Sequence, residues 1–327
     1  MILAGDIGGT KTILALFETS GRGNPLVEET FPSRDHKTFD EVVETFVARH
    51  RPKVELACVG VAGPVKNGRC EATNLPWVVD AGDLARDLGI SRAWLLNDLE
   101  AYAHGIAVLG PEDVFELNAG ARDTTGNRGV IAAGTGLGEA GLFWDGRGWQ
   151  PWATEGGHTD FAPAGELEIE LLRFLLKQHE RVSWERLVSG MGLVNIYRFF
   201  KETGRHEEPT WLVEAMRAGD PGAVIAQHAR DGRSPLCTAT LDLFLALYGA
   251  EAGNLALKTM AQGGLYVGGG IAPKNLERLK ASAFLGRFTA KGRMRPLLEA
   301  MPVRVILNEK TGLLGAAHGA ALRTARA

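Results

Sequence analysis

Short apolar runs separated by glycine-rich turns dominate the first part of the chain. Residues 2–4 and 13–17 predict the two strands of a hairpin, and residues 26–31 predict a third antiparallel strand. Apolar residues then recur at helical spacing up to about His50, where Pro52 ends the predicted helix. Three strands and a helix are therefore expected to open the chain.

The next segment continues the alternation of strands and helices. Residues 54–62 and 92–96 predict buried strands, with a short helix between them. The order strand, strand, strand, helix, strand, helix, strand is typical of an open α/β sheet, in which ligands gather beyond the carboxyl ends of strands. We therefore expect Asp6, Gly63 and Asp98 to share one side of this sheet.

The second part of the chain repeats the strand pattern and adds long helices. Two strands, over 129–133 and 139–143, are predicted around the loop Gly134-Thr135-Gly136-Leu137-Gly138. Helices are expected from residue 166, over 184–200 and over 236–261, strands over 263–267 and 302–307, and a helix of small residues from residue 311.

The length of the chain, 327 residues, exceeds that of one ordinary domain. We therefore expect two lobes, residues 1–110 and 111–327, with a polar loop over 118–127 leading into the second. The terminal helix could pack back onto the first lobe. Each lobe carries one Gly/Thr loop, which favours two similar halves facing each other across a cleft, and two unrelated glycine turns are the alternative.

Composition narrows the class of partner and the compartment. The formal net charge of −3 disfavours nucleic acid and anionic membranes as partners. Cys58, Cys70 and Cys237 lie far apart, without the spacing of a metal site, and fit a reducing compartment. No signal segment and no apolar run long enough to cross a bilayer is recognised, so a cytoplasmic protein is expected.

The first loop, Asp6-Ile7-Gly8-Gly9-Thr10-Lys11-Thr12, has the composition of an anion-binding turn. Its glycines allow close approach of the backbone to a ligand, Thr10 adds a hydroxyl and Lys11 a cation. Asp6 could hold a hydrated metal ion beside the anion. An ordinary Gly-Gly hairpin turn is the alternative. The second Gly/Thr loop repeats the design and favours a pair of phosphate-binding loops.

A few polar side chains have the chemistry of a phosphoryl-transfer site. Asp98 precedes a helix whose N-terminus would stabilise a carboxylate, so it is the candidate base, and a plain N-cap aspartate is the alternative. Glu155 and His158 flank two glycines, and together with Glu185 they could bind several sugar hydroxyls. A structural or surface role is the alternative for His158, and the lack of nearby cysteines argues against zinc.

Taken in order, these motifs resemble the bacterial glucokinases of the proteobacterial and cyanobacterial type. These belong to the superfamily of actin, the hexokinases and the heat-shock chaperone ATPases, and the resemblance runs nearly end to end. It is carried by Gly5-Asp6-Ile7-Gly8-Gly9-Thr10-Lys11-Thr12, Val61-Ala62-Gly63-Pro64-Val65, Thr73-Asn74-Leu75-Pro76-Trp77, Leu96-Asn97-Asp98, Gly134-Thr135-Gly136-Leu137-Gly138, Glu155-Gly156-Gly157-His158, Leu187-Val188-Ser189-Gly190 and Gly268-Gly269-Gly270-Ile271.

The resemblance implies a fold, a reaction and a role for each site residue. The implied fold is α/β, with two ribonuclease-H-like lobes of mixed sheet facing a central cleft. The implied reaction is ATP-dependent, Mg²⁺-assisted phosphorylation of glucose at its 6-hydroxyl by a homodimer. Asp98 would be the catalytic base, Asn97, Asp98, Glu155, His158 and Glu185 would bind glucose, and Asp6 would hold Mg²⁺ through water. ATP would be bound by Asp6, Gly8, Gly9, Thr10, Lys11, Thr12, Gly134, Thr135 and Gly136 at its phosphates, and by Gly268, Gly269, Thr311 and Gly312 near its nucleoside.

The chain departs from the family pattern beside two site segments. Met191 stands where a proline is expected, and Leu99-Glu100 replaces a more usual Phe-Thr, which puts fine specificity in doubt. A kinase for another hexose, such as mannose or an N-acetylated hexosamine, is therefore an alternative. A sugar-sensing regulator of the same fold is a second one, although no basic DNA-binding element is recognised, and the cysteine-rich zinc motif of the related repressor and kinase group is absent.

Overall fold

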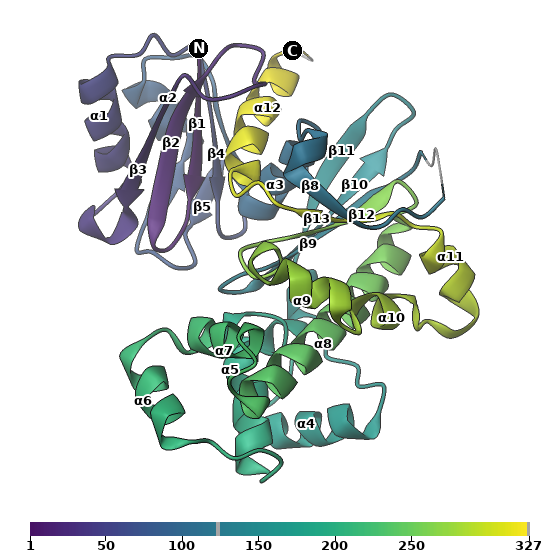
Figure 1. Ribbon diagram of the computed structural model, residues 1–327. Helices are drawn as coiled ribbons and strands as arrows, with labels where there is room; N and C mark the ends of the chain where they lie inside the picture. Colours follow the sequence, from purple (N-terminus) through teal and green to yellow (C-terminus); the bar gives the residue numbers. More distant parts are fainter. Residues whose placement is uncertain (122–124, 326–327) are drawn as a thin grey trace. The chain divides into compact units, whose positions relative to one another are not determined.

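The computed structural model describes residues 1–121 and 125–325 of the chain. Unit 1 comprises Met1–Asp113, Pro151–Ala153 and the C-terminal segment from Asn308, and unit 2 comprises Val114–Gln150 and Thr154–Leu307. Each unit is an α/β structure built on one large mixed sheet (Figure 1).

The sheet of unit 1 has the strand order β3-β2-β1-β4-β7. β1 (Ile2–Ile7), β2 (Lys11–Phe17) and β3 (Val27–Pro32) are antiparallel, and β4 (Leu56–Val61) and β7 (Ala93–Asn97) run parallel to β1. The five predicted strands are therefore confirmed. The pattern missed a separate hairpin of β5 (Arg69–Glu71) and β6 (Val78–Asp80), because a strand of three residues is too short to show a period.

Both faces of this sheet are buried. Alternate residues of β1 enter opposite cores, since Leu3 packs with α1 (Phe39–His50) and α2 (Ala81–Asp87), whereas Ile2 packs with α12 (Thr311–Ala325). Figure 1 shows α1 and α12 on opposite sides of the strands. β1, β2 and β4 thus read as near-continuous apolar runs because neither face of these strands meets water, whereas only Phe31 of the edge strand β3 is buried.

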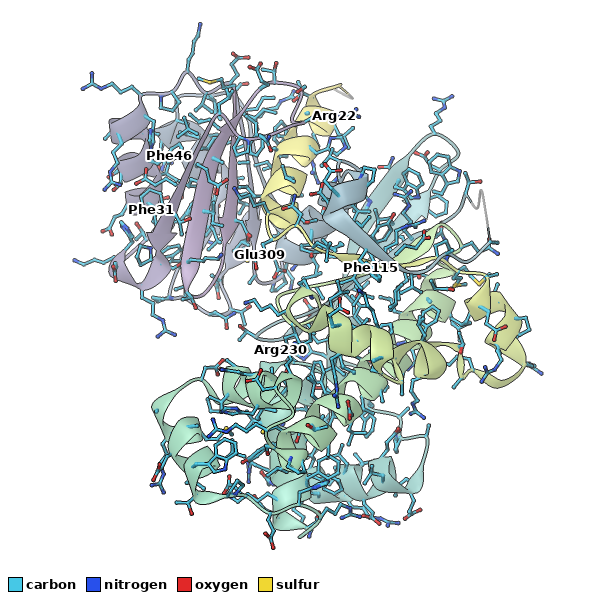
Figure 2. The ribbon with its side chains drawn as sticks, viewed as in Figure 1. Arg22, Phe31, Phe46, Phe115, Arg230 and Glu309 are labelled. Atoms are coloured by element: carbon cyan, nitrogen blue, oxygen red, sulfur yellow. The ribbon has the colours of Figure 1, made fainter. Side chains whose placement is uncertain are left out.

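Helix α1 illustrates how local sequence fixes an element. Phe46 of α1 packs against Phe31 of β3, with ring centroids 6.5 Å apart, and both rings are labelled in Figure 2. Thr38 caps the helix by accepting a backbone hydrogen bond of 3.3 Å. Arg51 ends it in the left-handed conformation directly before Pro52, so the expected helix end is confirmed.

Helices α3 (Asp98–Ile106) and α12 cross at backbone distance within unit 1. A Cβ added to Gly315 would lie 1.7 Å from the carbonyl oxygen of Ala101, and one added to Gly105 would lie 2.0 Å from that of Thr311. Glycine is therefore required on both helices, and the small-residue helix packs tightly against another helix of its own unit.

The sheet of unit 2 has the order β11-β10-β9-β12-β13-β8. β9 (Arg128–Ala133) is antiparallel to β10 (Leu137–Trp144) and parallel to β12 (Gly264–Gly268), which is parallel to β13 (Val303–Ile306). This sequence of a hairpin followed by two parallel strands repeats unit 1, and the predicted repeat is confirmed. The two edge strands, β8 (Val114–Asn118) and β11 (Trp149–Thr154), were not predicted. Of the expected polar loop, 122–124 lie outside the described residues.

Helices make up most of the remainder of unit 2. The long α8 (Pro235–Thr259) confirms the expected helix over 236–261. The expected helix over 184–200 is wrong at its start: a 3-10 turn, Trp184–Arg186, comes first, and α5 begins only after Ser189 caps it. None of the described helices is long and apolar enough to cross a membrane. Besides α8, the described α-helices of unit 2 are α4 (Glu166–Leu176), α5 (Gly190–Glu202), α6 (Thr210–Ala218), α7 (Pro221–Arg230), α9 (Leu276–Ala281), α10 (Phe284–Thr289) and α11 (Arg295–Glu299).

Candidate active site

The carboxyl ends of β1, β4 and β7 bring three expected site segments together in unit 1. Ile7 pairs with Val61, and Val61 pairs with Asn97, so the three strands end in register. Asp6 lies one residue before the end of β1, Gly63 lies two residues after the end of β4, and Asp98 directly follows β7. The three therefore share the carboxyl-end side of the sheet, as expected.

Asn97, rather than Asp98, caps helix α3. Its Oδ1 accepts hydrogen bonds from the amides of Leu99 (3.0 Å) and Glu100 (3.4 Å), and its Nδ2 donates to the carbonyl oxygen of Gly63 (3.1 Å). The interpretation of Asp98 as the N-cap is therefore wrong. Asn97 links the end of β7 to the turn after β4, which fixes the position from which α3 starts.

Asp98 is the first residue of α3. Its Oδ1 accepts a hydrogen bond of 2.9 Å from the amide of Leu99, which orients the carboxylate. In the first turn of a helix the macrodipole favours the ionised form of a carboxyl group. This position suits a group that must accept a proton or a hydrogen bond from a hydroxyl.

The first Gly/Thr loop is a tight turn held by Ser33, which sequence reasoning missed. The amide of Gly8 donates to the Lys11 carbonyl oxygen (3.0 Å) and closes the turn. Ser33 Oγ donates to the carbonyl oxygen of Gly8 (2.7 Å), and the Ser33 amide donates to that of Thr10 (3.0 Å). Because Ser33 holds these two carbonyl groups, the orientation of the peptide planes between them is fixed. Within the described chain, the amides of Gly9 and Thr10 have no recorded hydrogen-bond partner, as an anion-binding turn requires.

Asp6 lies beside this loop and beside the start of α12. A Cβ on Gly312 would be 3.5 Å from Asp6 Oδ2, so this glycine allows α12 to start against the carboxylate. Burial raises the pKa of Asp6, and the charge of Lys11 partly offsets this. A divalent cation would supply a counter-charge for this partly buried carboxylate. Among the described residues no group of three or more metal-ligating side chains occurs.

The second Gly/Thr loop is fixed by Glu185 and by the start of α5. The amide of Gly190 donates to the Gly134 carbonyl oxygen (2.8 Å), and the amide of Leu137 donates to Glu185 Oε2 (3.1 Å). A Cβ on Gly136 would lie 2.4 Å from that same oxygen. Glycine at 136 is therefore explained by the close approach of Glu185.

The three expected sugar-binding side chains of unit 2 lie together. His158 Nδ1 is 3.9 Å from Glu185 Oε1, and His158 Nε2 is 4.0 Å from Glu155 Oε2. His158 and Glu155 are exposed, whereas Glu185 is largely covered. Two carboxylates on either side of an imidazole present several acceptors and donors to a ligand rich in hydroxyl groups.

The expected nucleoside-binding segments are divided between the two units. In unit 2, Gly268 ends β12 and Gly269 adopts a φ of +77°, with a Cβ position only 2.3 Å from the carbonyl oxygen of Ala133. The buried Tyr248 supports them, since its hydroxyl accepts from the Ala133 amide (3.1 Å) and lies 3.1 Å from the Gly268 carbonyl oxygen. Thr311 belongs to unit 1, where its hydroxyl donates to the carbonyl oxygen of Asn308 (2.7 Å). Tyr248 gave no sequence signal, because it lies in a helix that is apolar nearly all round.

The departures from the family pattern occupy supporting positions. The backbone amide of Leu99 donates hydrogen bonds to the side-chain oxygens of Asn97 and Asp98. Any residue except proline would provide this amide. Glu100 forms an ion pair with Arg323 of α12 at 3.1 Å. Met191 is exposed, and its sulfur lies 3.1 Å from Arg186 Nη1.

Comparison with known proteins assigns the chain to a family. The family model described as Glucokinase matches residues 3–323. The chain belongs to the glucokinase family. It is 45% identical to the glucokinase of Nostoc punctiforme over 98% of this chain and 99% of that protein. It is 42% identical to the glucokinase of Synechocystis over 98% of this chain and 97% of that one.

Solved structures support the same assignment. A crystal structure of glucokinase from an Antarctic psychrotroph is 30% identical, covers 98% of both chains and superposes with a TM-score of 0.82. The expected fold, of the kind shared by glucokinases and related sugar kinases, is thus confirmed. Family membership likewise confirms the expected class of enzyme, an ATP-dependent hexose kinase.

Proposed function

We propose that this member of the glucokinase family transfers the γ-phosphoryl group of ATP to the 6-hydroxyl of glucose, with Asp98 as the general base. The observation that carries the proposal is the placement of Asp98. Its carboxylate is fixed by the Leu99 amide in the first turn of α3, while Asn97 takes the capping role. A base in this reaction has to orient one hydroxyl and accept its proton as the phosphoryl group transfers.

From the family resemblance we infer that Glu155, His158 and Glu185 bind the sugar and that Asp98 receives its 6-hydroxyl. His158 lies 4.0 Å from Glu155 and 3.9 Å from Glu185, so it joins the two carboxylates. Asn97 is assigned mainly to fixing the start of α3, because its amide oxygen and nitrogen both have backbone partners. One N–H remains for a sugar hydroxyl. Acceptors for several hydroxyl groups would fix the sugar, so that only its 6-hydroxyl meets the base.

ATP is proposed to be held by the two Gly/Thr loops. The amides of Gly9 and Thr10 and the side chain of Lys11 would bind phosphate oxygens from one loop, and Thr135 with its neighbouring glycines would do so from the other. Gly268, Gly269, Thr311 and Gly312 are proposed to lie near the nucleoside. Asp6 would hold a hydrated Mg²⁺, which when bound neutralises charge on the phosphates. The homodimer and the cytoplasmic location stay predictions of the family resemblance.

A coupled assay with purified protein tests this function. The sugars are glucose, mannose and N-acetylglucosamine, and the phosphoryl donors are ATP, ADP and polyphosphate, each with and without Mg²⁺. Glucose with MgATP is expected to give the highest kcat/KM. A higher kcat/KM for another hexose would assign the chain to that sugar, and turnover with none of the sugars would contradict the kinase proposal.

A further inference from the structure

Glu139 of β10 is a buried carboxyl group with no role in the proposed chemistry. Its side chain is 1% exposed, and within the described part of the chain its Oε1 has no hydrogen-bond partner. An isolated buried carboxylate is unfavourable unless it is neutralised or paired. The surroundings of Glu139 therefore need an explanation.

One side of Glu139 supports the loop that carries Glu155 and His158. A Cβ added to Gly156 would lie 1.9 Å from Glu139 Oε2, so the loop backbone rests directly on the carboxyl group. Two hydrogen bonds reinforce this contact. Thr154 Oγ1 donates to the Glu139 carbonyl oxygen (2.9 Å), and the Gly156 amide donates to Thr154 Oγ1 (3.2 Å). The position of the loop thus depends on Glu139.

The other side of Glu139 meets α8, which contributes a second buried carboxyl group, Glu251. The negative charge of Glu251 acts on Glu139 and raises its pKa. Glu251 has partners of its own, since Asn254 Nδ2 donates to its Oε2 (2.7 Å) and Lys258 Nζ lies 3.4 Å from its Oε1. Lys291 reaches the same network through Asn254 Oδ1 (2.6 Å). Lys258 and Asn254 thus bond to Glu251, while the positive charge of Lys258 offsets the raised pKa of Glu139 only in part.

The charge state of Glu139 follows from this arrangement. Burial, and then the negative charge of Glu251, raise the pKa of Glu139 to about 8. The charged groups that act on it are Glu251 and Lys258, and Lys291 joins the same network. On the opposite side, the loop that rests on it carries Glu155 and His158, and Glu185 binds the amide of Leu137, two residues before Glu139. Loss of its proton would place a second negative charge against Glu251 and under Gly156.

We propose that Glu139 is a positioning residue for the sugar, whose buried carboxyl group holds the Glu155–His158 loop in its binding geometry through its contact with Gly156. Ionisation of Glu139 at alkaline pH would disturb this contact and weaken sugar binding. The inference rests on the proposed role of Glu155 and His158. If only the protonated form binds well, about one tenth of the protein is competent one pH unit above the pKa, and the apparent Kd rises about tenfold.

The experiment measures glucose binding without ATP, by intrinsic tryptophan fluorescence, from about pH 6.5 to 9, together with KM for glucose and for ATP. In the wild type, Kd and KM for glucose are expected to rise about tenfold toward pH 9, while KM for ATP changes little. Glu139→Gln keeps the shape and stays neutral, so glucose affinity should equal that of the wild type at pH 6.5 and remain level. Glu251→Gln removes the neighbouring negative charge that raises the pKa of Glu139, so the rise in Kd and KM for glucose should move to lower pH.

Three results would overturn the inference. They are a level wild-type profile, an alkaline rise that persists unchanged in Glu139→Gln, and a loss of glucose affinity in Glu139→Gln at pH 6.5 although its thermal unfolding matches the wild type. A merely structural role predicts the last of these. Absence of glucose binding at every pH would instead contradict the proposed function, so the two failures are distinguishable.

Discussion

Ser33→Ala tests whether the side-chain hydrogen bond of Ser33 to the Gly8 carbonyl oxygen holds the first Gly/Thr loop in place. Ser33 is fully buried, and the substitution removes the hydrogen bond from its Oγ to the Gly8 carbonyl oxygen (2.7 Å) and the one shared with Thr12 Oγ1 (3.0 Å). Each buried hydrogen bond contributes about 1 kcal/mol, and a buried group left without a partner costs about 1–3 kcal/mol. We therefore expect a loss of about 2–3 kcal/mol in the free energy of unfolding unit 1.

Ser33→Ala should weaken the binding of ATP more than the binding of glucose. Because the loop backbone loses its support, KM for ATP is expected to rise by about tenfold, the equivalent of about 1.4 kcal/mol. KM for glucose should change by less than about twofold. The assays are urea unfolding followed by circular dichroism and steady-state kinetics with each substrate varied.

A matched control separates the two hydrogen bonds of Ser33. Thr12→Val is nearly isosteric and removes the Thr12 hydroxyl but leaves the bond from Ser33 to Gly8. It should therefore have the smaller effect on KM for ATP. Wild-type stability together with an unchanged KM for ATP in Ser33→Ala would refute the reasoning, as would equal effects of the two variants.

Two further predictions concern stability. Gly315→Ala places a methyl group 1.7 Å from the Ala101 carbonyl oxygen and should destabilise the packing of α3 on α12 by about 1–3 kcal/mol. In the control Gly286→Ala the new methyl group meets nothing within 4 Å, so this variant should be as stable as the wild type or more stable. Thermal unfolding compares the two variants, and equal melting temperatures would contradict the close approach of α3 and α12. Because the folded-state pKa of Glu139 is raised to about 8, the folded protein holds a proton that the unfolded chain releases near 4.5, so stability should fall as the pH rises through this interval. Urea midpoints should decline toward alkaline pH in the wild type and decline less in Glu139→Gln, and parallel declines would exclude this group as the cause.

The strands and the site loops were predictable because their signals are local. The apolar runs on both sides of Gly8 and Gly134 gave the two hairpins, and Pro52 gave the end of α1. The edge strand β8 was missed because it precedes its partner β13 by most of unit 2, and only that pairing makes it a strand. The sequence of a short segment does not indicate which distant strand it will pair with.

The site residues divide in the same way. Asp98 and His158 stand in recognisable motifs, whereas Ser33, Tyr248 and Glu139 act through contacts with residues far along the chain. A buried serine after a strand or a tyrosine in an apolar helix looks structural until the fold shows which loop it supports. The supporting residues could therefore be found only in the structure.

The central claim is that Asp98 is the base that receives the sugar hydroxyl proton, and Asp98→Asn tests it most directly. Asparagine keeps the size of the side chain and an oxygen that can accept the hydrogen bond from the Leu99 amide, but it cannot accept a proton. The measurement is kcat together with the Kd of glucose obtained by tryptophan fluorescence. We expect kcat to fall by about 10²–10⁴-fold while the Kd changes by less than about threefold. A kcat near that of the wild type, in a variant that binds glucose normally, would contradict the account.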